Sequence, residues 1–206
     1  MLIDTPVGEV PARLEGEGDT GILLATGAGT GQDHPGVAGL RSRLARRHLV
    51  MTFEYAYRAA GRRFPDRQPA LLAVHRAAAA RLAEHVGDRL VLAGRSMGGR
   101  MSTILAAQGE PCRAVVAYGY PLHPPGKPDK LRVDHLPSLP VPTLFLSGDR
   151  DALATPTLME QHVAPLEMAT LVWVEGADHS FRRRGTTPDA MLDHLVEVTE
   201  DWLSEL

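Results

Sequence analysis

The sequence has little of what marks secreted, membrane-spanning or nucleic-acid-binding proteins. Cys112 is the only cysteine among 206 residues, so no disulfide can form within the chain, and a reducing compartment is expected. No apolar run approaches the length of a membrane-spanning helix, and residues 1–4 lack the positive start of a signal peptide. The net charge of −3 lacks the basic excess of nucleic-acid-binding domains. We therefore expect a soluble, cytoplasmic protein that binds neither membranes nor nucleic acids.

What remains is the composition of an ordinary globular protein, with 44% hydrophobic and 23% charged residues. A chain of 206 residues can bury a substantial core without disulfides. No internal repeat, low-complexity tract or linker divides it. We predict a single domain over residues 1–206, present as a monomer or a homodimer.

Short apolar runs alternate with segments of helical periodicity. Strands are predicted at 21–25, 49–55, 90–93, 113–118, 143–147 and 170–174, after a hairpin within 2–17. Helices are predicted to start at Pro35, to span 69–86, to follow residue 96, and to span 157–168 and 188–206. Between 121 and 142, seven prolines exclude a long helix. This alternation predicts an α/β fold with a doubly wound, mostly parallel sheet.

The last predicted helix has an apolar stripe and a charged face. Its buried side is predicted to hold Met191, Leu195, Val198 and Trp202. Its water-facing side is predicted to hold Asp193, Glu197 and Glu200. Such a helix packs one face on a sheet.

The chain is organised around residues 89–107, RLVLAGRSMGGRMSTILAA, where an apolar run passes through G-R-S-M-G into a helical pattern. A strand that turns sharply into a helix, called an elbow, holds the central hydroxyl clear of the sheet. The helix directs its positive N-terminal end at this hydroxyl. Side chains at Gly94 and Gly98 would collide where strand, turn and helix crowd together. The G-x-S-x-G pattern in this position predicts that Ser96 is a nucleophile.

Polar residues follow two later strands, where parallel strands gather their chemistry at the carboxyl edge of a sheet. A serine hydroxyl needs a base, and that base needs an orienting acid. His179 is expected to take the proton of Ser96. The acid is Asp151 or Asp149, which share one turn, and the Gly148-x-x-Asp spacing favours Asp151. The order Ser, Asp, His is the one expected for a triad on such a sheet.

A tetrahedral oxyanion needs hydrogen-bond donors aimed at it, each worth roughly 3–4 kcal/mol. The backbone N–H of Met97, just after the nucleophile, is expected to be one donor. The Gly-rich turn at 26–31 is expected to supply the other, from the N–H of Ala28.

Four segments, GRSMGGR, LFLSGDRD, GADHSF and TGAGTGQDHP, resemble small lidless α/β-hydrolases close to the dienelactone-hydrolase-like group, and a subfamily of compact serine hydrolases. The resemblance covers nearly the whole chain. It implies an α/β-hydrolase sheet without a helical cap, with Ser96, Asp151 and His179 in the triad positions and no cofactor. Two departures matter: Thr26-Gly27 stands where many members have His-Gly, and dienelactone hydrolases themselves use cysteine as the nucleophile.

Charged and polar residues near the elbow are expected to line or support a substrate pocket. Arg95 and Arg100 flank the elbow, where a cation opposes the helix N-terminus, so a carboxylate partner is expected and Glu54 is the candidate. The alternative is that one of these arginines binds an anionic substrate. Gly27 in the oxyanion turn and His123 after a strand end complete the candidate set.

The other histidines and a basic run are expected to lie away from the site. The histidines expected at the surface are His34, His48, His75, His85, His135, His162 and His194. The run 182–184, three arginines just beyond the predicted base, is expected to be a solvated loop.

Other functions fit the sequence less well. A dinucleotide-binding domain would use Gly27-x-Gly29 and Glu54, but Gln32 stands where its third glycine should be, and the triad residues stay unexplained. An inactive scaffold is opposed by the intact triad. No His and Asp cluster has the spacing of metal ligands. The sequence therefore predicts a serine hydrolase that cleaves a small-molecule ester or thioester through an acyl-enzyme.

Overall fold

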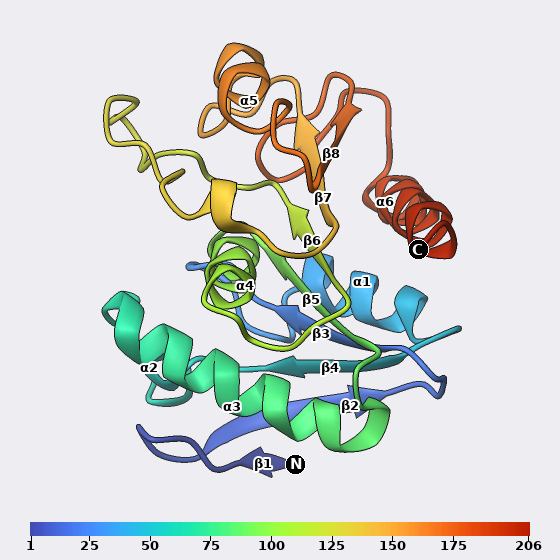
Figure 1. The fold of residues 1–206 in the computed structure, drawn as a ribbon. Coiled ribbons are helices and arrows are strands. Elements are labelled where there is room, and N and C mark those ends of the chain that lie inside the picture. The colour runs from blue at the N-terminus through green and yellow to red at the C-terminus, as the bar shows by residue number, and fades with distance from the viewer.

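A computed structural model describes all 206 residues and shows one eight-stranded sheet with helices on both faces (Figure 1). The strands are β1 (Leu2–Ile3), β2 (Val10–Glu15), β3 (Gly21–Ala25), β4 (Leu49–Phe53), β5 (Leu90–Arg95), β6 (Ala114–Tyr118), β7 (Thr143–Gly148) and β8 (Ala169–Val174). The helices are α1 (Pro35–Leu44), α2 (Ala56–Ala59), α3 (Gln68–Val86), α4 (Met97–Ala107), α5 (Pro156–His162) and α6 (Pro188–Ser204), with one 3₁₀ turn, η1 (Leu136–Ser138).

The strands lie in the order β1-β2-β4-β3-β5-β6-β7-β8, and β3 to β8 are all parallel to one another. The first two strands form the predicted hairpin and add to β4 antiparallel. From β3 the chain first moves outward to β4 and then returns to pair β5 on the other side. The strand order therefore reverses between β3 and β5, and ligands of open parallel sheets bind where this reversal opens a crevice.

The sheet separates two cores, as expected for strands buried on both faces. One core packs β strands against α3 and α4, and the other packs them against α1 and α6 (Figure 1). Alternate residues of β5 divide between them: Leu90 and Leu92 enter the first core, Val91 and Ala93 the second. Because side chains alternate along a strand, this parity fixes the face onto which the last residue of β5 projects.

The doubly wound, mostly parallel sheet without a helical cap is confirmed, and several boundaries differ from the prediction. The helix predicted over 157–168 ends at His162, because Pro165 cannot continue it. The strand predicted to reach residue 55 ends at Phe53, and the short helix α2 follows unpredicted. The connection over 121–142 is irregular as predicted, holding only η1. No helix has both the length and the apolar character needed to cross a bilayer.

The last helix, α6, buries the predicted stripe with two changes. Val198 is only half-buried, and Thr199 is fully buried, where its hydroxyl lies 2.9 Å from the hydroxyl of Tyr118. The prediction that Glu200 faces water is wrong. Its side chain is 14% exposed and its carboxylate lies 3.0 Å from His48 Nε2, because α1 packs against α6 and the turn after α1 covers this end of it.

Candidate active site

Ser96 lies at the sharp turn between β5 and α4, with a backbone conformation of φ 49° and ψ −112°. A positive φ at a residue other than glycine costs about 1–3 kcal/mol and persists only where surrounding packing enforces it. Here the packing is closest at two glycines that flank the serine. A Cβ on Gly98 would lie 2.6 Å from the carbonyl oxygen of Ala25, and a Cβ on Gly94 would strike the backbone of Gly98. The crowding predicted from the sequence is therefore the reason that positions 94 and 98 are glycines.

Three side chains from separate strand ends form one chain of hydrogen bonds. The hydroxyl of Ser96 lies 2.8 Å from His179 Nε2, and His179 Nδ1 lies 2.7 Å from Asp151 Oδ2. A carboxylate only accepts hydrogen bonds, so Nδ1 carries the proton and Nε2 is left to accept from the serine hydroxyl. The side chain of His179 is 27% exposed and that of Asp151 is fully buried, so the hydrogen-bonded series is buried at its aspartate end and open toward solvent at its serine end.

The two aspartates of the turn after β7 have separate partners. Asp151 also accepts the backbone N–H of Leu153 through its second oxygen, at 2.7 Å. Asp149 instead accepts the N–H of Gly176 at 2.6 Å, which ties the end of β7 to the end of β8. The structure therefore brings Asp151 to the histidine and holds Asp149 away from it.

The Gly-rich turn after β3 lies against the elbow, as the reversal of strand order requires. The N–H of Ala28 has no acceptor in the protein, and Met97 begins α4, so its N–H has no intrahelical acceptor. Two side chains hold the turn. Tyr57 Oη donates to the carbonyl oxygen of Ala28 at 2.7 Å, and Thr30 Oγ1 accepts the N–H of Gly27 at 3.1 Å. Tyr57 was not singled out from the sequence, because its helix is too short to carry a periodic signal.

A pocket of about 720 Å³ opens beside Ser96 and His179. Its walls come from the turn after β3, the first residues of α1, the loop after His179 and the N-terminal half of α6. Gly27, Ala28 and Arg95 line it, as expected. The pocket therefore lies on the α1 and α6 side of the sheet.

The wall of this pocket is basic. Arg95, Arg182 and Arg183 line it, together with His34 at the N-terminus of α1. Burial lowers the pKa of the Arg95 guanidinium, and only the more distant charge of Asp178 opposes that shift. Burial, and then the nearby guanidinium groups of Arg95 and Arg182, lower the pKa of His34. His34 thus belongs to the pocket rather than to a distant surface, contrary to the prediction.

Three predicted pocket residues lie elsewhere. Glu54 pairs with neither arginine. One of its oxygens accepts the N–H of Gln32 at 2.8 Å, the other is buried without a partner, and burial raises its pKa. Arg100 donates to Gln68 at 2.7 Å on the far side of α4. His123 is buried, and its Nδ1 donates to the carbonyl of Pro124 at 2.9 Å. None of the three lines the pocket. Arg100 projects from α4 toward Gln68, and the loops that carry Glu54 and His123 direct their side chains away from the pocket.

His75 also departs from its predicted surface position. It lies fully buried between α3 and α4, with Nδ1 3.1 Å from the hydroxyl of Tyr55. Burial lowers its pKa to about 3, so it is neutral at physiological pH. The apolar face of α3 includes this position, and the prediction overlooked that periodicity.

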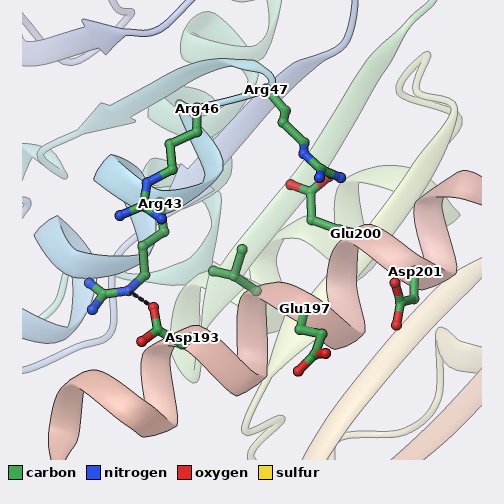
Figure 2. Close-up of a pocket in the computed structure, with 8 residues that line it drawn as sticks. Arg43, Arg46, Arg47, Asp193, Glu197, Glu200 and Asp201 are labelled. Carbon is green, nitrogen blue, oxygen red and sulfur yellow. Dashed lines mark hydrogen bonds and ion pairs between the residues drawn. The ribbon is translucent and has the colours of Figure 1, made fainter.

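A second hollow, of about 510 Å³, lies between the C-terminal end of α1 and the middle of α6 (Figure 2). Its walls are charged almost throughout, with Arg43, Arg46, Arg47, Asp193, Glu197, Glu200 and Asp201. Arg43 Nε lies 2.6 Å from Asp193, and Arg47 lies 3.8 Å from Glu200. No group of three or more His, Cys, Asp or Glu side chains is placed to hold a metal ion.

Fold and geometry together define a class: a parallel α/β sheet that joins serine, histidine and aspartate at its carboxyl edge. Residues 18–204 match the family described as the alpha/beta hydrolase domain, and the chain belongs to that family. The small lidless form expected from the motifs is also found among solved structures of similar fold.

Three of these structures illustrate the likeness. A putative α/β hydrolase from Agrobacterium tumefaciens is 18% identical, with a TM-score of 0.79 over 99% of this chain and 94% of that one. A serine hydrolase without a lid from Xanthomonas campestris is 21% identical, with a TM-score of 0.74 over 98% and 93%. A thermophilic esterase from Thermogutta terrifontis is 17% identical, with a TM-score of 0.74 over 100% and 98%. At these identities the likeness establishes the fold.

Proposed function

We propose that the protein is a serine hydrolase that cleaves a small ester or thioester through an acyl-enzyme. The observation that carries the proposal is the hydrogen-bonded chain from Ser96 through His179 to Asp151, with its serine end open to the pocket. Nothing in this sequence of steps requires a cofactor. Family membership supports hydrolysis in general, and the ester specificity is our inference from the nucleophile.

In the first half-reaction Ser96 Oγ attacks the carbonyl carbon while His179 Nε2 accepts the hydroxyl proton. The buried carboxylate of Asp151 keeps the imidazole in the required tautomer and stabilises the imidazolium that forms. The carbonyl oxygen becomes an oxyanion, for which the N–H groups of Met97 and Ala28 are the proposed donors. The imidazolium then gives its proton to the departing alcohol or thiol, and the acyl group remains on the serine.

The second half-reaction repeats these steps with water. His179 takes a proton from the water as it attacks the acyl-enzyme, and returns the proton to Ser96 Oγ when the acid leaves. Since the connection over 121–142 carries no helical cap, the site opens directly to solvent. We expect short or exposed acyl groups to be cleaved faster than long lipid chains.

A fluorophosphonate probe tests the nucleophile without knowledge of the substrate. Labelling of the wild-type protein, mapped to Ser96 by peptide mass spectrometry and absent in Ser96→Ala, is the expected result. Ser102→Ala is a matched control, because this nearby serine is buried and bonds the carbonyl oxygens of Gly98 and Ala93. A folded wild-type protein that the probe fails to label would favour an inactive scaffold.

A panel of 4-nitrophenyl and thiol esters tests the reaction. Both classes of ester are expected to be cleaved, and esters with short acyl chains are expected to be cleaved faster than those with long chains. Cleavage that increases steadily with acyl length, as in a lipase, would contradict the open site.

The cellular setting is also a proposal. A single cysteine, Cys112, and a triad that needs no cofactor are consistent with action in the cytoplasm on a small molecule. Burial raises the pKa of Cys112 to about 11, which keeps it a thiol. The expected assembly, a monomer or a homodimer, is measured by light scattering of the purified protein.

A further inference from the structure

Arg95 occupies a position that the sheet normally gives to an apolar side chain. It is the last residue of β5, and by strand alternation it projects onto the same face as Val91 and Ala93, which lie in the core under α1 and α6. At the carboxyl edge this face opens into the pocket beside Ser96. A guanidinium therefore stands where the core ends and the pocket begins.

No carboxylate in the protein pairs with this guanidinium. Arg95 makes no ion pair within 4.0 Å, and none of the hydrogen bonds of the structure uses its side chain. The acidic residue that acts on it at longer range is Asp178, whose Oδ1 accepts the N–H groups of Ser180 and Arg182. A largely buried cation without a carboxylate partner is costly, and proteins keep one where a ligand supplies the charge.

The protein contact of Arg95 is aromatic. Its Cζ lies 5.9 Å from the centre of the Phe181 ring. Phe181 has a positive φ of 57°, a strained conformation for a phenylalanine, and it follows His179 by two residues. The strained turn thus brings the base and the ring that supports Arg95 to the same wall, while the hydrogen-bonding edges of the guanidinium remain without protein partners.

The other charges of the pocket do not neutralise Arg95. Arg182 and Arg183 are exposed at the rim and form no ion pair. The one carboxylate that lines the pocket, Asp189, is 2.9 Å from Arg43. His34 Nδ1 accepts the N–H of Gly36, so its proton is on Nε2, which is left as a further donor.

We propose that the substrate is an ester or thioester bearing a carboxylate, and that Arg95 receives this carboxylate in the pocket beside Ser96. This assignment rests on the proposed hydrolase function and specifies its substrate class. The planar fork of arginine matches the two oxygens of a carboxylate. One guanidinium lies inside while the others stay at the exposed rim, which matches a single negative charge bound within.

Two pairs of substrates test the preference and locate the anion. With the anion on the acyl side, 4-nitrophenyl hydrogen adipate is compared with the neutral 4-nitrophenyl hexanoate of equal chain length. With the anion on the alcohol side, 4-acetoxybenzoate is compared with 4-acetoxybenzamide. We expect kcat/KM to be at least tenfold higher for the anionic member of one pair, as for hydrogen bonds to charged groups.

Variants assign the preference to Arg95. Arg95→Met, which keeps volume against the Phe181 ring, is expected to reduce the anionic-to-neutral ratio of kcat/KM to within twofold of unity. Arg95→Lys keeps the charge without the fork and is expected to give an intermediate ratio. The matched control is Arg46→Met, because Arg46 is exposed in the second hollow and forms no ion pair, so the ratio is expected to remain that of the wild type.

Binding to a protein that cannot turn over separates this inference from the proposed reaction. Ser96→Ala is titrated calorimetrically with each of the two anionic esters, 4-nitrophenyl hydrogen adipate and 4-acetoxybenzoate, and Ser96→Ala/Arg95→Met is expected to bind the one that Ser96→Ala binds more tightly at least tenfold more weakly. Cleavage of neutral and anionic esters at equal rates, or a preference that persists in a folded Arg95→Met, would overturn the role of Arg95 and leave the hydrolase standing. Absence of both cleavage and probe labelling would refute the hydrolase, and the calorimetry would still judge the carboxylate site.

Discussion

The two hollows along α1 and α6 each contain three arginines, but they differ in how many acidic residues accompany them. Arg43, at the second hollow, reaches two carboxylates at 2.6 and 2.9 Å. Figure 2 shows Asp193 and Glu200 of α6 facing Arg43 and Arg47. In the pocket beside Ser96, Arg95 has no carboxylate, and the one acid in the wall is already paired. One hollow is thus a charged seam between two helices, and the other is a basic pocket next to Ser96.

The difference shows how paired and unpaired arginines separate structure from binding. Ion pairs between α1 and α6 join two helices that are distant in sequence, and they need no further partner. An arginine kept largely buried without an acid retains an interaction for something outside the chain. Three expected results test this contrast.

The largest effect is expected on catalysis, and only on the pocket side. Asp151→Asn is expected to lower kcat by about 10⁴-fold, because an asparagine leaves the imidazole in the wrong tautomer for Ser96. Asp193→Asn in the second hollow is expected to leave kcat within twofold of the wild type. The measurement is steady-state hydrolysis of a 4-nitrophenyl ester by each purified variant.

Asp149→Asn provides a closer control, because it lies in the same turn as Asp151 and bonds Gly176 rather than His179. Its loss of kcat is expected to be much smaller. Equal losses in the two variants would mean that the integrity of the turn, rather than the partner of the histidine, governs the rate.

The next effect is on stability, with opposite signs in the two hollows. Arg43→Met removes an arginine with two carboxylate partners and is expected to lower the free energy of unfolding by about 1 kcal/mol. Arg95→Met removes a desolvated charge that no acid compensates and is expected to raise it by about 1 kcal/mol. Urea unfolding at neutral pH measures both. Destabilisation by both variants would indicate that Arg95 has an internal role like that of Arg43.

The smallest effect is on the titration of His34. Burial lowers the pKa of His34, and the guanidinium of Arg95 lowers it further because it disfavours a second positive charge nearby, so Arg95→Met is expected to raise that pKa. A bound carboxylate is expected to move it in the same direction. The imidazole signals of His34 in NMR titrations report this pKa, with Arg46→Met as the control. A pKa that stays constant in Arg95→Met would place His34 outside the influence of Arg95.

Local patterns predicted most of the elements of the fold. Continuous apolar runs marked each parallel strand to within two residues, because such strands are buried on both faces. The predicted helix extended past His162, where α5 ends, because the prediction followed apolar periodicity through Pro165. The short helix α2 escaped prediction because four residues carry no period.

The chemistry of the site was predicted unevenly. Ser96, Asp151 and His179 each follow a strand, so their meeting at one edge could be inferred from chain order. That Arg95 has no carboxylate partner could not be inferred, because pairing depends on where a side chain points after its strand ends. Glu54 was expected to be that partner and instead caps the turn at Gln32.

By itself, the sequence determined the parallel sheet, the strained elbow and the order of the three polar residues, since each depends on neighbours along the chain. The spacing favoured Asp151 over Asp149, and the tertiary structure brings Asp151 to the histidine, whereas only the tertiary structure decided which arginines are paired. The position of Asp151 depends on how the ends of β7 and β8 meet, and the pairing of Arg43 depends on the packing of α1 against α6, which joins it to Asp193, 150 positions away. Side-chain direction over such separations is set by packing, and no local pattern encodes it.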